Sequence, residues 1–148
     1  MAKAVYVLNG PNMNLLGSRQ PELYGRATLK DVEKLCAKAC KDHGFELVFR
    51  QSNHEGDLVD WLQEAGAKKA AGVVINGAGF TTTSISIHDA IKSIDVPVIE
   101  CHVTNIFARE AFRHQSVIAW ACKATMAGFG IQGYVLAITA IAGMISKR

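Results

Sequence analysis

The stretch AGVVIN, residues 71–76, decides the fold because it is a continuous apolar run that ends in a single asparagine. A strand with one face in water alternates apolar and polar side chains, whereas a strand covered on both faces has no need to alternate. Doubly covered strands are typical of parallel sheets, which carry helices on both faces. Residues 71–76 are therefore expected to form a central strand of a parallel sheet.

Strand and helix patterns alternate on both sides of this central strand, and the helical patterns are recognised by apolar residues three and four positions apart. We expect strands at residues 4–9, 45–51, 71–76, 97–103 and 123–128. We expect helices at residues 29–40, 58–66, 87–94 (capped by Ser84), 106–112 (capped by Asn105) and 134–145. The alternation predicts one α/β domain over residues 1–148, with a five-stranded parallel sheet between two layers of helices.

Composition excludes several classes of protein. Of the 148 residues, 49% are hydrophobic and 20% are charged, which suits a packed domain and argues against disorder. The net charge of +3 is dispersed, so nucleic-acid binding is not predicted, whereas a small anionic substrate suits this balance. No apolar run is long enough to span a membrane and no signal peptide opens the chain, so a cytoplasmic protein without membrane contact is expected.

The four cysteines lie inside the expected helices and strands rather than in turns. Cys36 and Cys40 share one helix face, which is compatible with metal binding, but no cluster of histidines or acidic residues accompanies them. Buried, reduced thiols are therefore the expected state of all four, Cys36, Cys40, Cys101 and Cys122.

Polar side chains follow four of the expected strands at the point where each strand ends. They are Asn9, Asn12, Asn14, Arg19 and Tyr24; Ser52, Asn53, His54 and Glu55; Asn76; and Glu100, His102, Thr104 and Asn105. Each has an ordinary structural explanation when taken alone, such as an asparagine in a turn or a tyrosine that packs its ring. Because the carboxyl ends of parallel strands meet at one edge, where ligands bind, the whole set predicts a site there.

The geometry of strands and helices groups some of these side chains further. Glu100 and His102 alternate with Cys101, so both are expected to point to the same side of the sheet. Arg109 and Arg113 are four residues apart in an expected helix, so they are expected to share one helix face.

The chain has no motif for a cofactor, a metal or a serine nucleophile. A glycine-rich dinucleotide fingerprint, a Walker loop, a nucleophile elbow and metal-ligand spacing of histidines are all missing from the sequence. The expected chemistry therefore uses tyrosine, histidine, arginine and asparagine side chains alone, without metal or cofactor. This set suits removal of a proton beside a carbonyl, with an acid that releases a leaving group.

Five motifs resemble those of one family, the type II 3-dehydroquinate dehydratases. They are LNGPNMNLLGSRQPELYG, QSNHEGDLVDWL, ECHVTN, AREAFRHQS and GFGIQGY, and the resemblance extends over about residues 4–145. It implies a flavodoxin-like fold and a dodecamer built of four trimers. It also implies trans elimination of water from 3-dehydroquinate, giving 3-dehydroshikimate through an enolate, in aromatic biosynthesis or quinate breakdown. No metal, cofactor or Schiff base takes part in that reaction.

The resemblance also implies a role for each matching residue. Tyr24 is the expected base, and Arg19, on a mobile loop, stabilises its charged form. His102 protonates the departing hydroxyl, and Asn12 holds a water at the enolate oxygen. The expected substrate-binding residues are Asn76, Thr82, Asp89 (across a trimer interface), Val103, Thr104 and Arg113, with Glu100 and Arg109 supporting the site and Arg109 also at its substrate wall.

The long segment between the first strand and the next helix, residues 10–28, fits these roles. A strand-to-helix connection needs only about 2 to 6 residues. A free tyrosine ionises near pH 10, but a cation within about 4–6 Å favours the phenolate. The segment is therefore interpreted as a lid that carries both the base and its activating arginine.

The substrate wall departs from the family pattern. Thr82 stands where the family usually has a histidine, Phe107 where a histidine is common, and Val117 where a tyrosine is common, and the turn Gly77-Ala78 is also unusual. Two alternatives to the dehydratase are therefore considered: a divergent enzyme that performs the same elimination on a related cyclic hydroxy-ketone acid, and a non-catalytic small-molecule binding protein. The presence of Arg19, Tyr24 and His102 argues against the second alternative.

Overall fold

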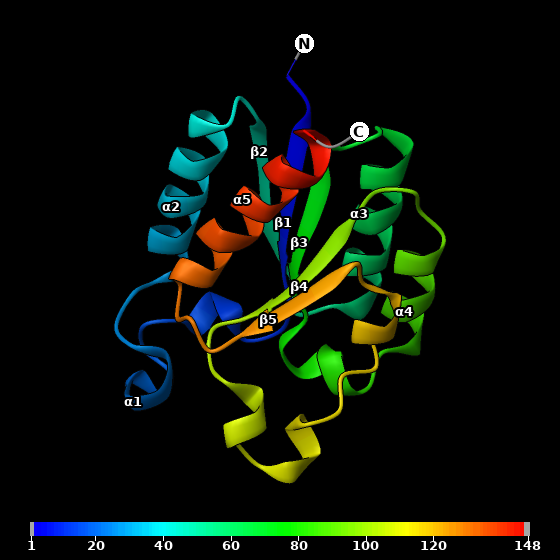
Figure 1. The fold of residues 1–148 in the computed structure, drawn as a ribbon. Coiled ribbons are helices and arrows are strands. Elements are labelled where there is room, and N and C mark those ends of the chain that lie inside the picture. Colours follow the sequence, from blue (N-terminus) through cyan, green and yellow to red (C-terminus); the bar gives the residue numbers. More distant parts are fainter. Residues whose placement is uncertain (1, 147–148) are drawn as a thin grey trace.

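The protein, seen in a computed structural model that describes residues 2–146, is built on one parallel five-stranded sheet (Figure 1). The strands are β1 (Ala4–Asn9), β2 (Glu46–Gln51), β3 (Gly72–Asn76), β4 (Val98–His102) and β5 (Ala124–Ala127). Their order across the sheet is β2-β1-β3-β4-β5, and every pair is parallel. The expected five-stranded α/β fold is confirmed, whereas a single catalytic domain over residues 1–148 stays a prediction, because its outermost residues lie outside the described part.

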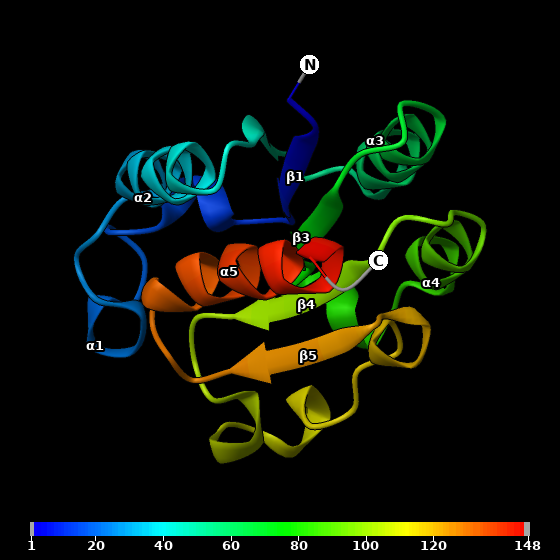
Figure 2. The ribbon, with the colours of Figure 1, turned by 45° about the horizontal axis from the view of Figure 1, so that its top comes forward.

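Residues 2–146 form five α-helices, of which all but the first cover the two faces of the sheet (Figure 2). They are α1 (Pro21–Tyr24), α2 (Leu29–Asp42), α3 (Glu55–Ala67), α4 (Ile85–Lys92) and α5 (Gln132–Ser146). Short 3-10 helices lie at Met13–Leu15, Ala78–Thr82, Ile106–Ala108, Ala111–Arg113 and Ala119–Ala121. Figure 2 shows α2 and α5 together over one face, while α3 and α4 lie together over the other.

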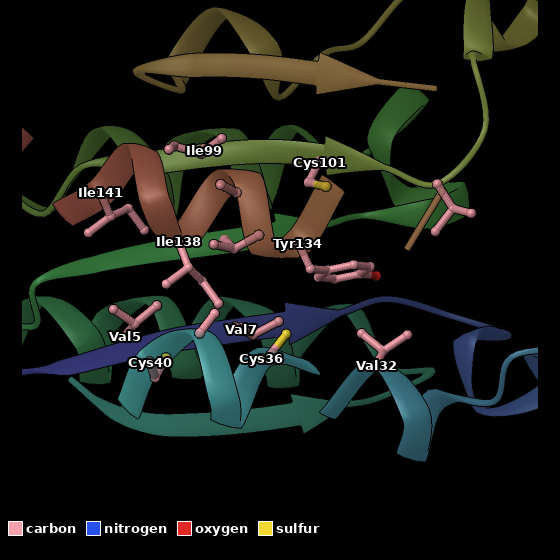
Figure 3. Packing of buried hydrophobic residues seen from close by; sticks show 14 of the residues in the cluster. Val5, Val7, Val32, Cys36, Cys40, Ile99, Cys101, Tyr134, Ile138 and Ile141 are labelled. Carbon is pink, nitrogen blue, oxygen red and sulfur yellow. The ribbon is translucent and has the colours of Figure 1, made fainter. Parts of the chain in front are cut away.

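Each face of the sheet has its own hydrophobic core. On the first face, α2 and α5 press Cys36 and Ile138 against β1 and β4 (Figure 3). On the second face, α3 and α4 bury Leu62 and Ile91 against the same strands and β3. Burying a large aliphatic side chain contributes about 1.5–3 kcal/mol, so both faces stabilise the central strands. The continuous apolar character of residues 71–76 follows from this double coverage, because β3 is buried throughout.

The start of α2 shows how local sequence fixes an element. Thr28 caps the helix by accepting a hydrogen bond from the Asp31 N–H at 3.2 Å, and the Asp31 carboxylate accepts from the Thr28 N–H at 2.9 Å. This reciprocal capping box satisfies two N–H groups that the helix itself leaves free. The helix begins immediately after residues 10–28, so the cap also fixes where that long segment ends.

One expected helix is wrong. Residues 106–112 were expected to form a single helix, but two 3-10 turns are present, and Arg109 lies between them with extended backbone. Phe107 and Phe112 are 64% and 67% exposed, so the segment has no continuous apolar face to bury, and packing cannot stabilise a helix this short. Arg109 and Arg113 therefore do not share a helix face. The expected cap is confirmed, because the Asn105 side chain accepts from the Phe107 N–H at 3.1 Å.

The strand order places a topological switch point between β1 and β3. The chain leaves β1 toward β2 on one side and later enters β3 on the other side, so the loops diverge and leave a crevice at the carboxyl ends. Asn9 and Asn76 are register partners at those ends. A Cβ atom at Gly10 would lie 2.4 Å from the Gly77 carbonyl oxygen, so only glycine permits this close approach of the two chain segments.

Candidate active site

A pocket of about 260 Å³ opens at the carboxyl ends of the strands, beside the switch point. The loop with α1 and the segment after β4 flank this end of the sheet (Figure 1). Most of the residues that the sequence predicted for the site line the pocket. They are Asn12, Arg19, Tyr24, Asn76, Thr82, His102, Val103, Thr104, Arg109 and Arg113.

The pocket wall carries positive charge. Arg19, Arg109 and Arg113 line it, and none of the described lining residues is an aspartate or a glutamate. The three arginines come from two segments of the chain that flank the carboxyl ends of the strands. Guanidinium groups bind carboxylates by paired hydrogen bonds, so the pocket favours an anionic ligand.

Tyr24 is held by an arginine from a distant segment. The Arg109 Nη1 group donates a hydrogen bond of 2.7 Å to the Tyr24 hydroxyl oxygen, and the Arg109 side chain is only 9% exposed. The guanidinium carbons of Arg109 and Arg19 lie 5.4 and 5.6 Å from the centre of the tyrosine ring. Two cations therefore face one phenol, and the arginine in direct contact is Arg109, which was predicted to support the site and line its substrate wall rather than to contact the base.

His102 also lines the pocket and is backed by a buried carboxylate. The Glu100 Oε2 atom contacts the His102 Nε2 atom, as expected from their alternation along β4. Glu100 is 1% exposed, and its Oε1 atom accepts a hydrogen bond of 2.9 Å from the Ser116 hydroxyl. Because Glu100 holds Nε2, the Nδ1 atom is the imidazole nitrogen left for a ligand. Ser116 was not predicted from the sequence, since nothing local distinguishes it.

The first turn after β1 is anchored, whereas α1 is not. Asn12 has a φ of 70°, a left-handed conformation that asparagine tolerates well, and its N–H donates to the Asn53 side chain at 3.0 Å. Met13 and Leu16 are buried in the core. By contrast, α1 has no buried residue. A segment with few buried contacts opens at low free-energy cost, which suits a lid.

Two threonines form part of the wall near Asn76. The Thr82 hydroxyl donates to the Gly79 carbonyl at a long 3.5 Å. Thr81 is 2% exposed, and its hydroxyl oxygen has no hydrogen-bond partner within residues 2–146. A buried hydroxyl without a partner is costly, so Thr81 is a further ligand-facing candidate. The sequence offered no signal for it within a run of three threonines.

Two predicted site residues do not line the pocket, namely Glu100, which contacts His102, and Asp89. Asp89 is exposed on α4 and lines a separate groove with His88, Val117, Ile85 and Trp120. Trp120 is 85% exposed and Ile85 is 62% exposed. Asp89 therefore reaches a pocket of this kind only if it belongs to a neighbouring copy.

The cysteines and the remaining titratable groups form no metal site in the described residues. Within residues 2–146 no group of three or more His, Cys, Asp or Glu side chains converges. All four cysteines are unpaired, and Cys36, Cys40 and Cys101 are buried as expected, whereas Cys122 is only half-buried. Burial raises the pKa of Cys40 to about 11 and that of Cys101 to about 12, so both stay protonated and unreactive. No helix between residues 2 and 146 has the length and apolar character to cross a membrane.

Comparison with known proteins agrees with this geometry. Residues 3–142 match the family model for class II dehydroquinases. The chain is 58% identical to the 3-dehydroquinate dehydratase of Rhodopseudomonas palustris strain TIE-1, covering 98% of this chain and 96% of the relative. It is 59% identical to that of Acidovorax sp. strain JS42, covering 96% and 99%. The crystal structure of the type II dehydroquinase from Propionibacterium acnes superposes with a TM-score of 0.92 at 38% identity, over 97% of this chain and 98% of that one. The chain therefore belongs to the class II dehydroquinase family.

Proposed function

We propose that this protein removes water from 3-dehydroquinate by trans elimination, giving 3-dehydroshikimate through an enolate. The observation that carries the proposal is the hydrogen bond of 2.7 Å between Arg109 and the Tyr24 hydroxyl, in a pocket whose charged wall residues are arginines. A base, a cation that activates it and a site for an anion are thereby combined in one cavity. We expect the reaction to serve the shikimate pathway or quinate breakdown, in the cytoplasm.

Tyr24 is the proposed base. A phenol is a weak base at neutral pH, but adjacent cations favour the phenolate. Arg109 donates directly to the Tyr24 oxygen, and the Arg19 guanidinium lies over the ring. The phenolate takes the proton from the carbon beside the ketone, and the electron pair of that C–H bond forms the enolate. Asn12, at the start of the lid, is proposed to hold the water that stabilises the enolate oxygen.

His102 is the proposed acid. Collapse of the enolate forms the carbon–carbon double bond and breaks the bond to the hydroxyl group, which leaves as water with the proton from His102. The buried Glu100 carboxylate orients the imidazole, while the Ser116 hydroxyl donates a hydrogen bond to the other carboxylate oxygen. General acid and base groups typically contribute about 10²–10⁴-fold each to the rate.

The arginines and the loop after β4 are proposed to bind the substrate carboxylate. Arg113 lies at the pocket mouth, where its Nε donates to Glu110 at 3.1 Å and its other N–H groups remain available. Val103 and Thr104 line the same side, directly after β4. Asn76 and Thr82 are proposed to bind substrate oxygen atoms on the wall that follows β3.

A neighbouring copy is proposed to complete the site with Asp89. Support comes from the groove beside α4, where Trp120 and Ile85 expose large apolar surfaces next to Asp89. Exposed apolar patches of this kind mark interfaces, and closed symmetric assemblies bring such a patch against a neighbouring subunit. We therefore propose trimers in which Asp89 of one subunit reaches the pocket of the next, assembled into a dodecamer of four trimers.

The direct test is the absorbance of the conjugated enone product when 3-dehydroquinate is added to the protein. We expect turnover that neither EDTA nor borohydride abolishes, because residues 2–146 contain no converging metal ligands and no lysine lines the pocket. Loss of activity with EDTA, or irreversible trapping of the substrate by borohydride, would contradict the proposed mechanism. Absence of product from the native protein would contradict the proposed function itself.

Thr82 is the observation that favours the second candidate, a divergent dehydratase for a related cyclic hydroxy-ketone acid. Its hydroxyl is turned toward Gly79, so one substrate oxygen has no imidazole partner here. Replacing Thr82 by histidine is expected to lower KM for 3-dehydroquinate by about 2- to 12-fold, the value of one hydrogen bond, with kcat unchanged. An unchanged or raised KM in steady-state kinetics would favour the divergent substrate.

A further inference from the structure

A chain of four hydrogen bonds runs beneath the pocket, from the end of β2 to the turn after β3. The Asn9 Nδ2 group donates to the Arg50 carbonyl oxygen at 3.2 Å, and the Tyr134 hydroxyl donates to Asn9 Oδ1 at 2.7 Å. The Asn76 Nδ2 group donates to the Tyr134 oxygen at 3.0 Å, and the Ala78 N–H donates to Asn76 Oδ1 at 3.1 Å. The chain therefore joins β1, β2, β3 and α5 through three side chains.

The direction of every bond in this chain is determined by its two ends. At one end a backbone carbonyl can only accept, so Asn9 must turn its amide nitrogen toward Arg50 and its oxygen toward Tyr134. At the other end a backbone N–H can only donate, so Asn76 must turn its oxygen toward Ala78 and its nitrogen toward Tyr134. A hydroxyl group in the middle is required, because it donates to one amide and accepts from the other.

Tyr134 is suited to this position by its burial. The ring lies between α5 and the sheet, and its oxygen points toward the carboxyl ends of the strands (Figure 3). The residue is 0% exposed, and burial raises the pKa of Tyr134 far above its ordinary value, so the hydroxyl keeps its proton. Neither Tyr134 nor Asn9 lines the pocket, whereas Asn76 does.

The amide of Asn76 has one N–H group beyond the bond to Tyr134. That group is directed toward the Met13 sulfur, with Nδ2 and Sδ 3.7 Å apart. Sulfur is a weak acceptor, so a ligand oxygen competes with it easily. Since Asn76 and Met13 both line the pocket, the amide offers a donor to the ligand at this wall, and an inverted amide would offer an acceptor instead.

We propose that Tyr134 is a positioning residue for the dehydration: its hydroxyl holds the Asn76 amide so that an N–H group faces the substrate. The inference rests on the proposed function, since it concerns the same pocket and the same substrate. Through Tyr134, its last residue, the GFGIQGY segment thus affects substrate binding from outside the pocket.

The test is the replacement of Tyr134 by phenylalanine, which keeps the ring and removes the hydroxyl. Asn76 then keeps the bond from the Ala78 N–H to its oxygen but loses the acceptor of its N–H group, so the amide is held less firmly, and KM for 3-dehydroquinate is expected to rise by about 2- to 12-fold, the value of one hydrogen bond. The amide transfers no proton in the reaction, so kcat is expected to stay within about twofold of the native value. The melting temperature is expected to fall, because two buried amide groups lose a partner.

Tyr6→Phe is the matched control for this loss of stability. Tyr6 is 1% exposed in the core on the opposite face of the sheet, and its hydroxyl donates to the Glu64 carboxylate at 2.6 Å. This variant also loses a hydroxyl that donates a hydrogen bond from a buried ring, but Tyr6 has no hydrogen bond to Asn76. It is expected to lower the melting temperature while leaving both KM and kcat unchanged.

The outcomes separate this inference from the proposed function. A native protein that turns over 3-dehydroquinate, with KM unchanged in Tyr134→Phe or with only kcat reduced, would overturn the inference and leave the function standing. A native protein without turnover would overturn both. If Tyr134→Phe fails to fold, Asn9→Leu gives the same test, because it keeps a similar volume and removes the acceptor that directs the Tyr134 proton, so the Tyr134 hydroxyl no longer has to turn its oxygen toward Asn76. KM is then expected to rise, and an unchanged KM would overturn the inference.

Discussion

At the scale of single residues, the site depends on side chains that meet from distant parts of the chain. Tyr24 and Arg109 are 85 residues apart in the sequence, and Tyr134 and Asn9 are 125 apart. Residue types and their position after strands were enough to predict Tyr24, His102 and Asn76 as site residues. The alternation along β4 also predicted Glu100 as the partner of His102, but the long-range partners of Tyr24 and Asn76 could not be predicted, because no local pattern encodes which long-range pairs form.

The contact between Arg109 and Tyr24 gives a prediction about turnover. Arg109→Ala is expected to reduce kcat by about 10- to 150-fold, since it removes a hydrogen bond from a charged donor to the base. Arg19→Ala is expected to reduce kcat as well, because it removes the second cation over the ring. Arg26→Ala, an exposed arginine on the same connection that does not line the pocket, serves as the control and should retain native kinetics. Steady-state kinetics that show a normal kcat in Arg109→Ala would contradict its proposed role.

At the scale of elements, continuous apolar runs predicted the central strands, because burial on both faces requires apolar side chains throughout. The strand bounds agree with the predictions to within one residue, and the central run at residues 71–76 forms β3. Prediction failed in segments that bury too few side chains to require a regular spacing of apolar residues. Residues 106–112 bury only Ile106, so nothing selects a helix there, and α1 was missed inside the long connection because it buries no residue.

A cluster that joins β1, β2 and α3 predicts how stability depends on acid. Glu64 accepts hydrogen bonds from Arg50 at 2.9 Å and from Tyr6 at 2.6 Å. These bonds, chiefly that from Arg50, lower the pKa of Glu64 from 4.5 to about 2. A carboxyl with a lowered folded-state pKa stabilises the fold above its unfolded value and loses that contribution as pH falls toward the folded value. The stabilisation is therefore complete above about pH 4.5 and is lost between about pH 4.5 and 2.

Thermal unfolding of native protein and Glu64→Gln checks this expectation. The glutamine variant should melt at a lower temperature at pH 7, and the difference should shrink as the pH falls through that window. Lys38 and Asp42 form an exposed ion pair on α2, so Asp42→Asn is a suitable control with little effect at any pH. If the difference in melting temperature between native protein and Glu64→Gln stays constant down to pH 2, ionisation of Glu64 does not contribute to stability as predicted.

At the scale of the whole molecule, the sheet order brings the strand ends together, but the single chain leaves Asp89 outside the pocket. If Asp89 acts in the site of a neighbouring subunit, Tyr24→Phe and Asp89→Ala damage different halves of a shared site. Each variant alone is expected to be nearly inactive. When the two are unfolded together, mixed in equal amounts and refolded, about a quarter of the sites receive both intact residues, because subunits in a closed ring combine at random.

Recovery of about a quarter of native turnover in the mixture, together with a multimer by light scattering, is the predicted result. The two variants refolded separately and then combined provide the control for simple addition of activities. An active monomer, or a mixture no more active than its components, would contradict a site shared between subunits.

The central claim is that Tyr24 removes the proton from 3-dehydroquinate, and the most direct test is the rate of enone formation by Tyr24→Phe. The phenylalanine keeps the ring and removes only the oxygen that Arg109 contacts. Because α1 buries no residue, the fold should survive, which circular dichroism verifies. We predict that kcat falls by about 10²–10⁴-fold, the contribution of a general base. Near-native turnover by Tyr24→Phe would contradict the account and would make His102 the first alternative base.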